Sequence, residues 1–170
     1  LPYELEEFPG RSFYRNSGSS NRTGIEIYYK RSWKNFNMIR SFSYAKYVFN
    51  DYIKKGKDLS GKSIPGIPSI TRNLELNYNN NGWKFQFNYN NIGKFYAEDE
   101  NKVTIDSYSI LNVQLNKTFY NSWGEISISG GIKNILNREY FDNIRINAFG
   151  GRYYEGAPGR NFFTSLMVKL

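Results

Sequence analysis

Pro158-Gly159-Arg160-Asn161-Phe162-Phe163-Thr164-Ser165-Leu166-Met167-Val168-Lys169-Leu170 forms a Pro-Gly turn followed by an alternating stretch that runs to the last residue. Read with a period of two, Phe162, Leu166, Val168 and Leu170 fall on one face of a strand, and Ser165 and Lys169 fall on the other. The closing strand of an outer-membrane barrel has this pattern, with one face toward lipid and one toward water. A half-buried edge strand of a soluble protein alternates in the same way, so other segments must decide.

Composition removes several classes of function. The chain has 170 residues and a formal net charge of +8, and it contains no Cys and no His. Without Cys there is no disulfide scaffold or thiolate metal site, and without His the commonest general base and transition-metal ligand are missing. We therefore predict neither an enzyme nor a metal or cofactor site. No stretch reaches the roughly 20 apolar residues of a spanning helix, so a membrane role must use strands.

A basic chain rich in Tyr and Asn is also compatible with nucleic-acid binding, in which cations contact phosphates and rings stack on bases. The segment from Trp83 to Asn90 disfavours this alternative. Its aromatic residues all have one parity, whereas Lys84 and the amides have the other. Because rings and charges fall on opposite faces, one surface cannot supply both contacts, and we predict no nucleic-acid partner.

The alternation predicts about seven strands and no helix. The expected ranges are Thr23 to Trp33, Phe36 to Asn50, Thr71 to Asn79, Trp83 to Phe95, Ile105 to Thr118, Gly124 to Lys133, and Asn161 to Leu170. An apolar face opposes a polar face clearly in the fourth, fifth and sixth of these strands. The stretch from Asn37 to Tyr44 leaves a misfit in either parity, so its faces stay unassigned.

The connections between these strands alternate in length. Short turns fall at 34–35, 80–82 and 120–122, and long connections at 51–70, 96–104 and 135–160. This pattern predicts an antiparallel up-and-down transmembrane β-barrel segment with periplasmic turns and external loops. The tryptophans Trp33, Trp83 and Trp123 stand beside the short turns, where we expect an aromatic girdle at the membrane interface.

Seven strands do not fit a complete bacterial single-chain barrel, because such barrels have an even number of strands, from about eight upward. We therefore predict the C-terminal part of a larger barrel. The alternative is a complete eight-stranded adhesin or structural barrel, with an eighth strand within Leu1 to Asn21. The first residues show no Met, charged leader or apolar core, so we expect either a processed chain or a piece.

Four blocks resemble TonB-dependent receptors. They are Asn16-Ser17-Gly18 with Gly24-Ile25-Glu26, then Gly61 to Pro68, then Asn134 to Tyr140, and finally Pro158 to Phe162. The resemblance implies a barrel of about 22 strands with a plug domain, of which residues 1–170 are the last part. Two departures are Ile135-Leu136-Asn137, where the family commonly has Leu-Phe-Asp, and Leu170, where it commonly ends in an aromatic residue.

The resemblance also implies a function. Such receptors lie in the outer membrane of Gram-negative bacteria, in contact with lipid and lipopolysaccharide, after insertion by the barrel-assembly machinery. They admit a ferric siderophore, haem or cobalamin when TonB acts on the plug, without covalent chemistry. Glycan importers of the family usually carry an acidic Asp-Pro-Glu segment, and none lies between Tyr140 and Pro158. We therefore expect a ferric chelate as the cargo.

Arg and Tyr in the outer segments suit an anionic, aromatic chelate, because Arg pairs with oxyanions and Tyr offers a ring and a hydroxyl. The candidates are Tyr14, Arg15, Tyr52, Arg145, Arg152, Tyr153 and Tyr154. For each residue the alternative is packing against a neighbouring loop or binding lipopolysaccharide phosphates. We expect the acidic run 98–101 to be a solvated loop tip rather than a calcium site, and the lysines of 54–57 to form a solvated face.

Overall fold

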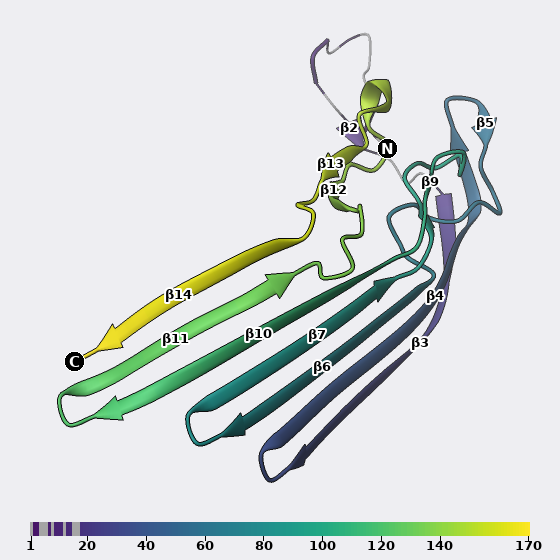
Figure 1. The fold of residues 1–170 in the computed structure, drawn as a ribbon. Helices are drawn as coiled ribbons and strands as arrows, with labels where there is room; N and C mark the ends of the chain where they lie inside the picture. Colours follow the sequence, from purple (N-terminus) through teal and green to yellow (C-terminus); the bar gives the residue numbers. More distant parts are fainter. Residues whose placement is uncertain (1, 4–6, 8, 12, 15–17) are drawn as a thin grey trace.

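The computed structural model describes residues 2–3, 7, 9–11, 13–14 and 18–170. They form one large antiparallel sheet and three two-stranded sheets, with folded loops at one end of the large sheet (Figure 1). Neighbouring strands follow the order β14-β11-β10-β7-β6-β4-β3. Their bounds are β3 (Gly18–Trp33), β4 (Phe36–Lys54), β6 (Ile70–Asn80), β7 (Trp83–Ile92), β10 (Tyr108–Asn121), β11 (Gly124–Lys133) and β14 (Asn161–Lys169). We call these strands the wall. They confirm the predicted all-β, up-and-down fold.

The sheet is open in the described part of the chain, with β3 at one edge and β14 at the other. Before β3, the described residues contribute only β1 (Pro2–Tyr3) and β2 (Phe13–Tyr14), which pair with each other and not with the wall. The eighth long strand that the small-barrel alternative requires is therefore not found among these residues. No helix in the described ranges is long and apolar enough to cross a membrane.

Strand register sorts the wall into two faces, because directly paired residues point to the same side. Leu111 pairs with Tyr89, Tyr89 with Leu74, and Leu74 with Arg40, which places Arg40 among apolar side chains. The same rows extend to Ile27, Ile25, Phe42, Met38, Phe36, Leu76, Tyr78, Phe85, Phe87, Val113, Leu115, Ile126, Ile128, Ile132, Phe162, Leu166 and Val168. We call this side the apolar face. Three-dimensional pairing thus assigns the faces of β4, which the sequence left open.

The opposite side, which we call the polar face, is tied together by side-chain hydrogen bonds between strands. The Gln86 amide donates to Asn77 Oδ1 at 3.0 Å, and the Asn116 amide donates to Ser129 Oγ at 2.8 Å. The Asn73 amide donates to Ser41 Oγ at 3.0 Å. These short polar groups satisfy one another across the ladder, so this face is ordered without an apolar layer above it.

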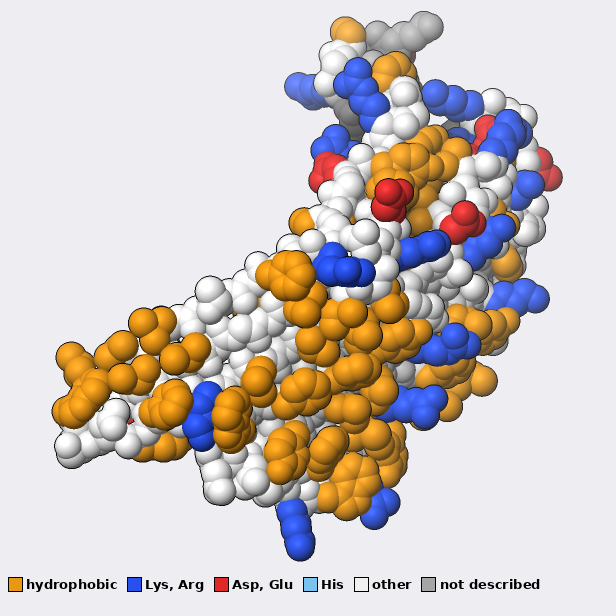
Figure 2. Space-filling model, in the orientation of Figure 1, with side chains coloured by type: hydrophobic (Ala, Val, Ile, Leu, Met, Phe, Trp, Pro, Cys, Tyr) orange, Lys and Arg blue, Asp and Glu red, His pale blue; other side chains and the backbone are white. Residues whose placement is uncertain are grey.

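The wall exposes its apolar side chains instead of burying them. Figure 2 shows them as a broad band over the strands, interrupted by Lys and Arg. Phe162 is 72% exposed, Leu166 67% and Ile25 59%. A soluble protein rarely shows a contiguous apolar surface of this extent, so the face needs an apolar partner.

Four strands differ clearly from the predicted ranges: β3 and β4 are longer, β7 is shorter, and β10 is shifted toward the C-terminus. β3 and β4 continue to Gly18 and Lys54, because pairing holds polar residues that show no apolar alternation. β7 ends at Ile92, before the predicted Phe95: the Gly93 N–H donates to the Ile70 carbonyl at 2.7 Å, and the chain then turns away. The following strand begins at Tyr108 and not at Ile105.

The long connections fold together at the end of the wall opposite the short turns (Figure 1). They contain β5 (Lys57–Asp58), β8 (Phe95–Tyr96), β9 (Thr104–Ile105), β12 (Phe141–Ile144), the 3-10 turn η1 (Phe149–Gly151) and β13 (Tyr154–Gly156). We call residues 55–69, 93–107 and 134–160 the loop block. Its core is a cluster of Phe95, Ala97 and Ile105, which pack with Ile144 and Tyr153.

Candidate functional site

Residues 134–138 belong to the first of the two C-terminal blocks that carry the family resemblance, and they form hydrogen bonds with the second. Asn134 is 2% exposed and has a left-handed backbone with φ of 50°. Its amide donates to the Arg138 carbonyl at 2.8 Å, and its Oδ1 accepts from the Arg138 N–H at 2.9 Å. Asn137 Oδ1 accepts from the Arg160 N–H at 2.9 Å, and Arg160 Nε donates to the Ile135 carbonyl at 2.9 Å. The motif therefore fixes how the last loop leaves β11 and enters β14.

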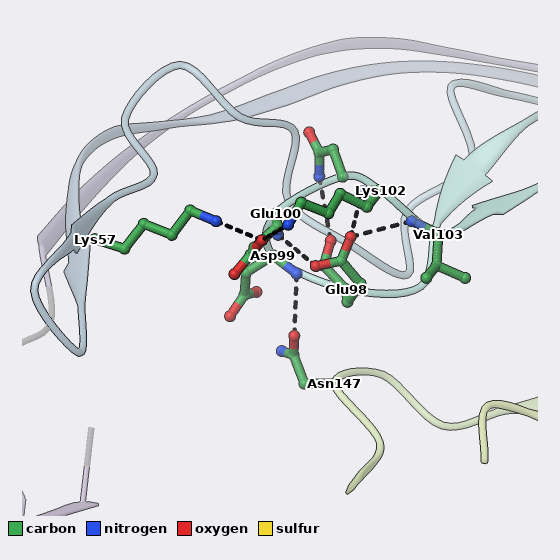
Figure 3. Close-up of polar contacts among 8 residues, drawn as sticks. Lys57, Glu98, Asp99, Glu100, Lys102, Val103 and Asn147 are labelled. Carbon is green, nitrogen blue, oxygen red and sulfur yellow. Dashed lines mark hydrogen bonds and ion pairs between the residues drawn. The ribbon is translucent and has the colours of Figure 1, made fainter. Parts of the chain in front are cut away.

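The hairpin 93–107 is the hub of the loop block, because it contacts both of the other loops. On one side the Gly66 N–H donates to the Tyr96 carbonyl at 2.8 Å. On the other side the Asn147 N–H donates to the Ala97 carbonyl at 2.9 Å, and Asn147 Oδ1 accepts from the Asp99 N–H at 3.0 Å (Figure 3). These bonds join segments that are 30 to 50 residues apart in the chain into one unit.

Asp99 is the buried charge of this hub, with 5% exposure. Lys54 Nζ lies 2.6 Å from its Oδ2, and the Tyr52 hydroxyl donates to the same oxygen at 3.2 Å. Burial, together with the charge of Asp99, raises the pKa of Tyr52. Burial alone would lower the pKa of Lys54, but the hydrogen bond and charge of Asp99 outweigh it and raise that pKa. Tyr52 and Lys54 lie at the loop end of β4, and both side chains therefore stay protonated at neutral pH.

The acidic side chains beside Asp99 bind nearby lysines and backbone N–H groups, as Figure 3 shows. Glu100 pairs with Lys102 at 2.7 Å and with Lys57 at 2.5 Å, and these two cations lower its pKa to about 2. The Glu98 carboxylate accepts from the backbone N–H groups of Glu100, Lys102 and Val103. The expectation of a solvated acidic tip and a solvated lysine face was wrong for Asp99 and Lys54, because their long-range pairing removes them largely from solvent. Lys57 is exposed, as expected, and pairs with Glu100 at the surface.

Several predicted ligand residues have structural partners in the hairpin β12–β13. Glu155 accepts from Arg145 at 2.5 and 3.1 Å, and this pairing lowers the Glu155 pKa. Tyr154 stacks on Phe141 with ring centroids 4.4 Å apart, and Tyr153 packs on the loop core. Arg152, next to them, is exposed.

The remaining predicted ligand residues lie apart from this hairpin. Tyr52 is buried beside Asp99, on the other side of the hub. Tyr14 lies in β2, of which the backbone is described, and Arg15 lies outside the described residues. The structure thus gathers Arg145, Arg152, Tyr153 and Tyr154 at one place but not the whole predicted set. Ligand contact by these residues stays a prediction.

A cleft of about 700 Å³ opens where the loop block meets the wall. The rings of Tyr108 and Tyr140 stack at 5.3 Å in its lining, beside Arg138, Glu139 and Asp106. Burial, with the nearby Tyr140 and Asp142, raises the pKa of Tyr108, which lies at the loop end of β10. The cleft offers stacked rings, a hydroxyl donor and charges of both signs. No sequence signal pointed to it, because its tyrosines meet only through the fold.

Residues 4–135 match the family model described as the TonB-dependent receptor-like β-barrel. The chain belongs to this family. TonB-dependent receptor barrels lie in the outer membrane of Gram-negative bacteria, and the family consists of receptors and transporters and not of enzymes.

Solved structures show the same fold at low sequence identity. The chain superposes on the ferric yersiniabactin uptake receptor FyuA from Yersinia pestis with a TM-score of 0.74, 18% identity and coverage of 91% of this chain and 24% of that one. BauA, the ferric preacinetobactin receptor from Acinetobacter baumannii, gives 0.73, 17%, 91% and 22%. The unliganded ferric citrate transporter FecA gives 0.72, 17%, 85% and 23%. The chain therefore spans about a quarter of the length of these receptors.

Proposed function

We propose that this chain is part of the wall and outer loops of an outer-membrane receptor that takes up a ferric siderophore or a similar iron chelate by TonB-dependent transport. The observation that carries the proposal is the difference between the two ends of the wall. Its short turns bear the tryptophans, and its long connections fold into one block with a cleft at the other end. Structurally similar proteins named as ferric chelate receptors support the choice of cargo.

In this proposal the apolar face contacts lipid and the polar face lines the lumen. Trp33, Trp83 and Trp123 are 42%, 46% and 53% exposed at the turns, as side chains at the periplasmic membrane interface should be. The loop block then faces the outside medium, where its apolar core, which includes Ile105 of the cleft lining, holds the cleft in shape before ligand arrives. Order of this kind lowers the entropic cost of binding.

The test is uptake of radiolabelled iron by cells that carry the full-length receptor and lack their own iron-chelate receptors. We expect energised uptake of at least one ferric chelate, and loss of that uptake when TonB is deleted. We also expect Arg152→Gln to weaken chelate binding by about tenfold, the value of a lost charge-assisted hydrogen bond, and Lys34→Gln at a short turn to leave it unchanged. Uptake of an oligosaccharide without uptake of any ferric chelate would contradict the proposed cargo.

A further inference from the structure

Cations stand on the apolar face of the wall, where charged residues are costly next to lipid. Two of them, Lys117 and Arg72, have a polar partner at the edge of the apolar band. Lys117 Nζ donates to the Asn81 carbonyl in a short turn at 2.8 Å and lies 4.9 Å from the Trp83 ring. Arg72, nearer the loop end, donates to Asn91 Oδ1 at 3.2 Å. These two side chains reach polar groups of the protein itself.

Arg40 is in a different position. It is exposed, and its direct neighbours on the two flanking strands are Tyr29 and Leu74. It stands four positions above Phe36, which corresponds to about 10 Å along the barrel axis for a strand tilted by about 40°. Arg40 therefore lies within the apolar band, on the side of the short turns.

A second arginine lies diagonally across from it. Arg31 pairs with Met38, and this pair lies two residues closer to the short turn than the pair of Tyr29 and Arg40. Side chains on such diagonals can reach the same group. The Arg31 guanidinium stacks over the Trp33 ring at 4.9 Å, which holds it close to the level of the tryptophans.

No protein carboxylate is available to these arginines in the described part of the wall. Of the acidic residues in its seven strands, Glu26, Glu75 and Glu125 fall on the polar face by register. Asp51 lies at the loop end of β4, eleven positions beyond Arg40. Arg40 has described strands on both sides and no acidic neighbour on the apolar face, so an anion from the membrane suits it and the nearby Arg31 as a counter-ion.

We propose that Arg31 and Arg40 form a binding site for the phosphate of a glycerophospholipid in the inner, periplasmic leaflet of the outer membrane. Guanidinium forks bind phosphate oxygens in pairs, and long side chains on a barrel surface bend toward the headgroup region. The position near the short turns selects the inner leaflet over lipopolysaccharide in the outer one. The bound headgroup is drawn up the wall at β3–β4, which thins the bilayer locally. This inference rests on the proposed orientation of the barrel in the membrane.

Native mass spectrometry of the full-length detergent-solubilised receptor tests the site with defined lipids. The probes are phosphatidylglycerol and diacylglycerol with the same acyl chains, so the phosphate headgroup is the difference. We expect the receptor to retain phosphatidylglycerol about tenfold better, and the double variant Arg31→Gln/Arg40→Gln to lose this preference. Arg40→Lys in the Arg31→Gln background keeps part of it. Arg22→Gln, on the same strand at the loop end, is the matched control and keeps all of it.

Three outcomes would overturn the site. They are equal retention of both lipids by the natural receptor, an unchanged preference in the double variant, and stronger retention of lipid A than of phosphatidylglycerol that depends on Arg40. A photo-crosslinker placed at position 40 in native membranes must label phospholipid; a protein as the main product would also contradict the proposal. Ferric chelate uptake by the double variant should be unchanged, so failure of the lipid site is distinguishable from failure of the transport proposal.

Discussion

The wall and the loop block treat apolar side chains in opposite ways. In the loop block Leu59, Ala97 and Ile105 are 2%, 0% and 3% exposed, as in a small water-soluble core. In the wall, Leu166 and Phe162 of the same chain are mostly exposed. One chain can satisfy the hydrophobic effect in both regions only if the two regions have different solvents. The comparison therefore assigns water to the loop block and lipid to the apolar face.

Charged side chains also differ between the loop block and the wall. Asp99 of the loop block is buried and pairs with Lys54 at the loop end of β4, and Glu100 pairs with Lys57 at the surface of the block. On the apolar face of the wall, Arg40 has no acidic residue in a neighbouring row of the described strands. Paired charges are what a folded unit in water can provide, whereas an unmatched cation on an apolar face depends on the membrane.

The largest effect is expected from a charge placed on the apolar face of the wall. Leu115→Arg, in the middle of β10, should destabilise the folded full-length receptor in phospholipid vesicles by about 2–4 kcal/mol. Gln114→Arg, one residue away on the polar face, should cost much less, because that side chain does not meet lipid. Unfolding by denaturant with a gel-shift readout measures both. Equal losses would show that the two faces share one solvent.

A smaller difference in stability is expected between alanine substitutions at two neighbouring glycines of β11, Gly131 and Gly130. A Cβ on Gly131 would lie 2.6 Å from the Phe163 ring and 2.6 Å from the Val113 carbonyl on the polar face. A Cβ on Gly130, on the apolar face, would come no closer than 3.7 Å to Phe163 O. Gly131→Ala should therefore cost about 1–3 kcal/mol in the same unfolding assay, and Gly130→Ala close to nothing. The reverse order would contradict the strand register.

In the loop block, Asp99→Asn removes the buried partner of Lys54 while it keeps the shape of the side chain. Because Lys54 is partly exposed, we expect a local loss of about 1–2 kcal/mol, confined to the loops. Hydrogen exchange at 95–105 and 144–148 should accelerate about five- to thirtyfold, with no change in the wall. Asp51→Asn, an exposed acid nearby, is the control. Unchanged exchange in the Asp99 variant would show that the pair does not hold the hub.

The smallest effect is a pH dependence limited to the loop block. The pKa of Glu100 is lowered to about 2, and that of Glu155 is also lowered, so both stabilise the loops above the ordinary carboxyl pKa. This stabilisation is lost as the pH falls from about 4.5 toward 2. Pulsed hydrogen exchange should therefore show looser loops in this window, and Glu100→Gln should weaken the dependence. The tryptophans report only on the turn end, so their fluorescence should stay constant; a parallel change would mean that the wall itself titrates.

Much of the wall could be predicted from the sequence, because a period of two is a local property. The parity of Trp83, Phe85 and Phe87 alone assigns the faces of β7. Arg40 marks the limit of this reasoning: β4 has misfits in both parities, and only its pairing with Leu74 decides its face. The polar start of β3 was missed for the same reason, since pairing with β4 and not local alternation makes it a strand.

The candidate site was far less predictable. Asp99 stands in a polar run that is typical of a loop tip, and its burial depends on Lys54, at the end of β4, and on Asn147 in the last long loop. The stacking of Tyr108 on Tyr140 is likewise a long-range contact. The motif from Asn134 to Arg138 was visible in the sequence, but its role in joining the last loop to β14 follows only from its hydrogen bonds.

The most direct test of the central claim is a spin-label scan of β7 in the full-length receptor in phospholipid vesicles. This chain has no native Cys, so each label position within it is unambiguous. Labels at positions 85, 87 and 89 should be accessible to oxygen dissolved in lipid, and labels at 84, 86 and 88 to a water-soluble nickel chelate. A period of two in opposite phase for the two reagents is the predicted result. Uniform accessibility to the nickel chelate along the strand would contradict a wall with one face in lipid.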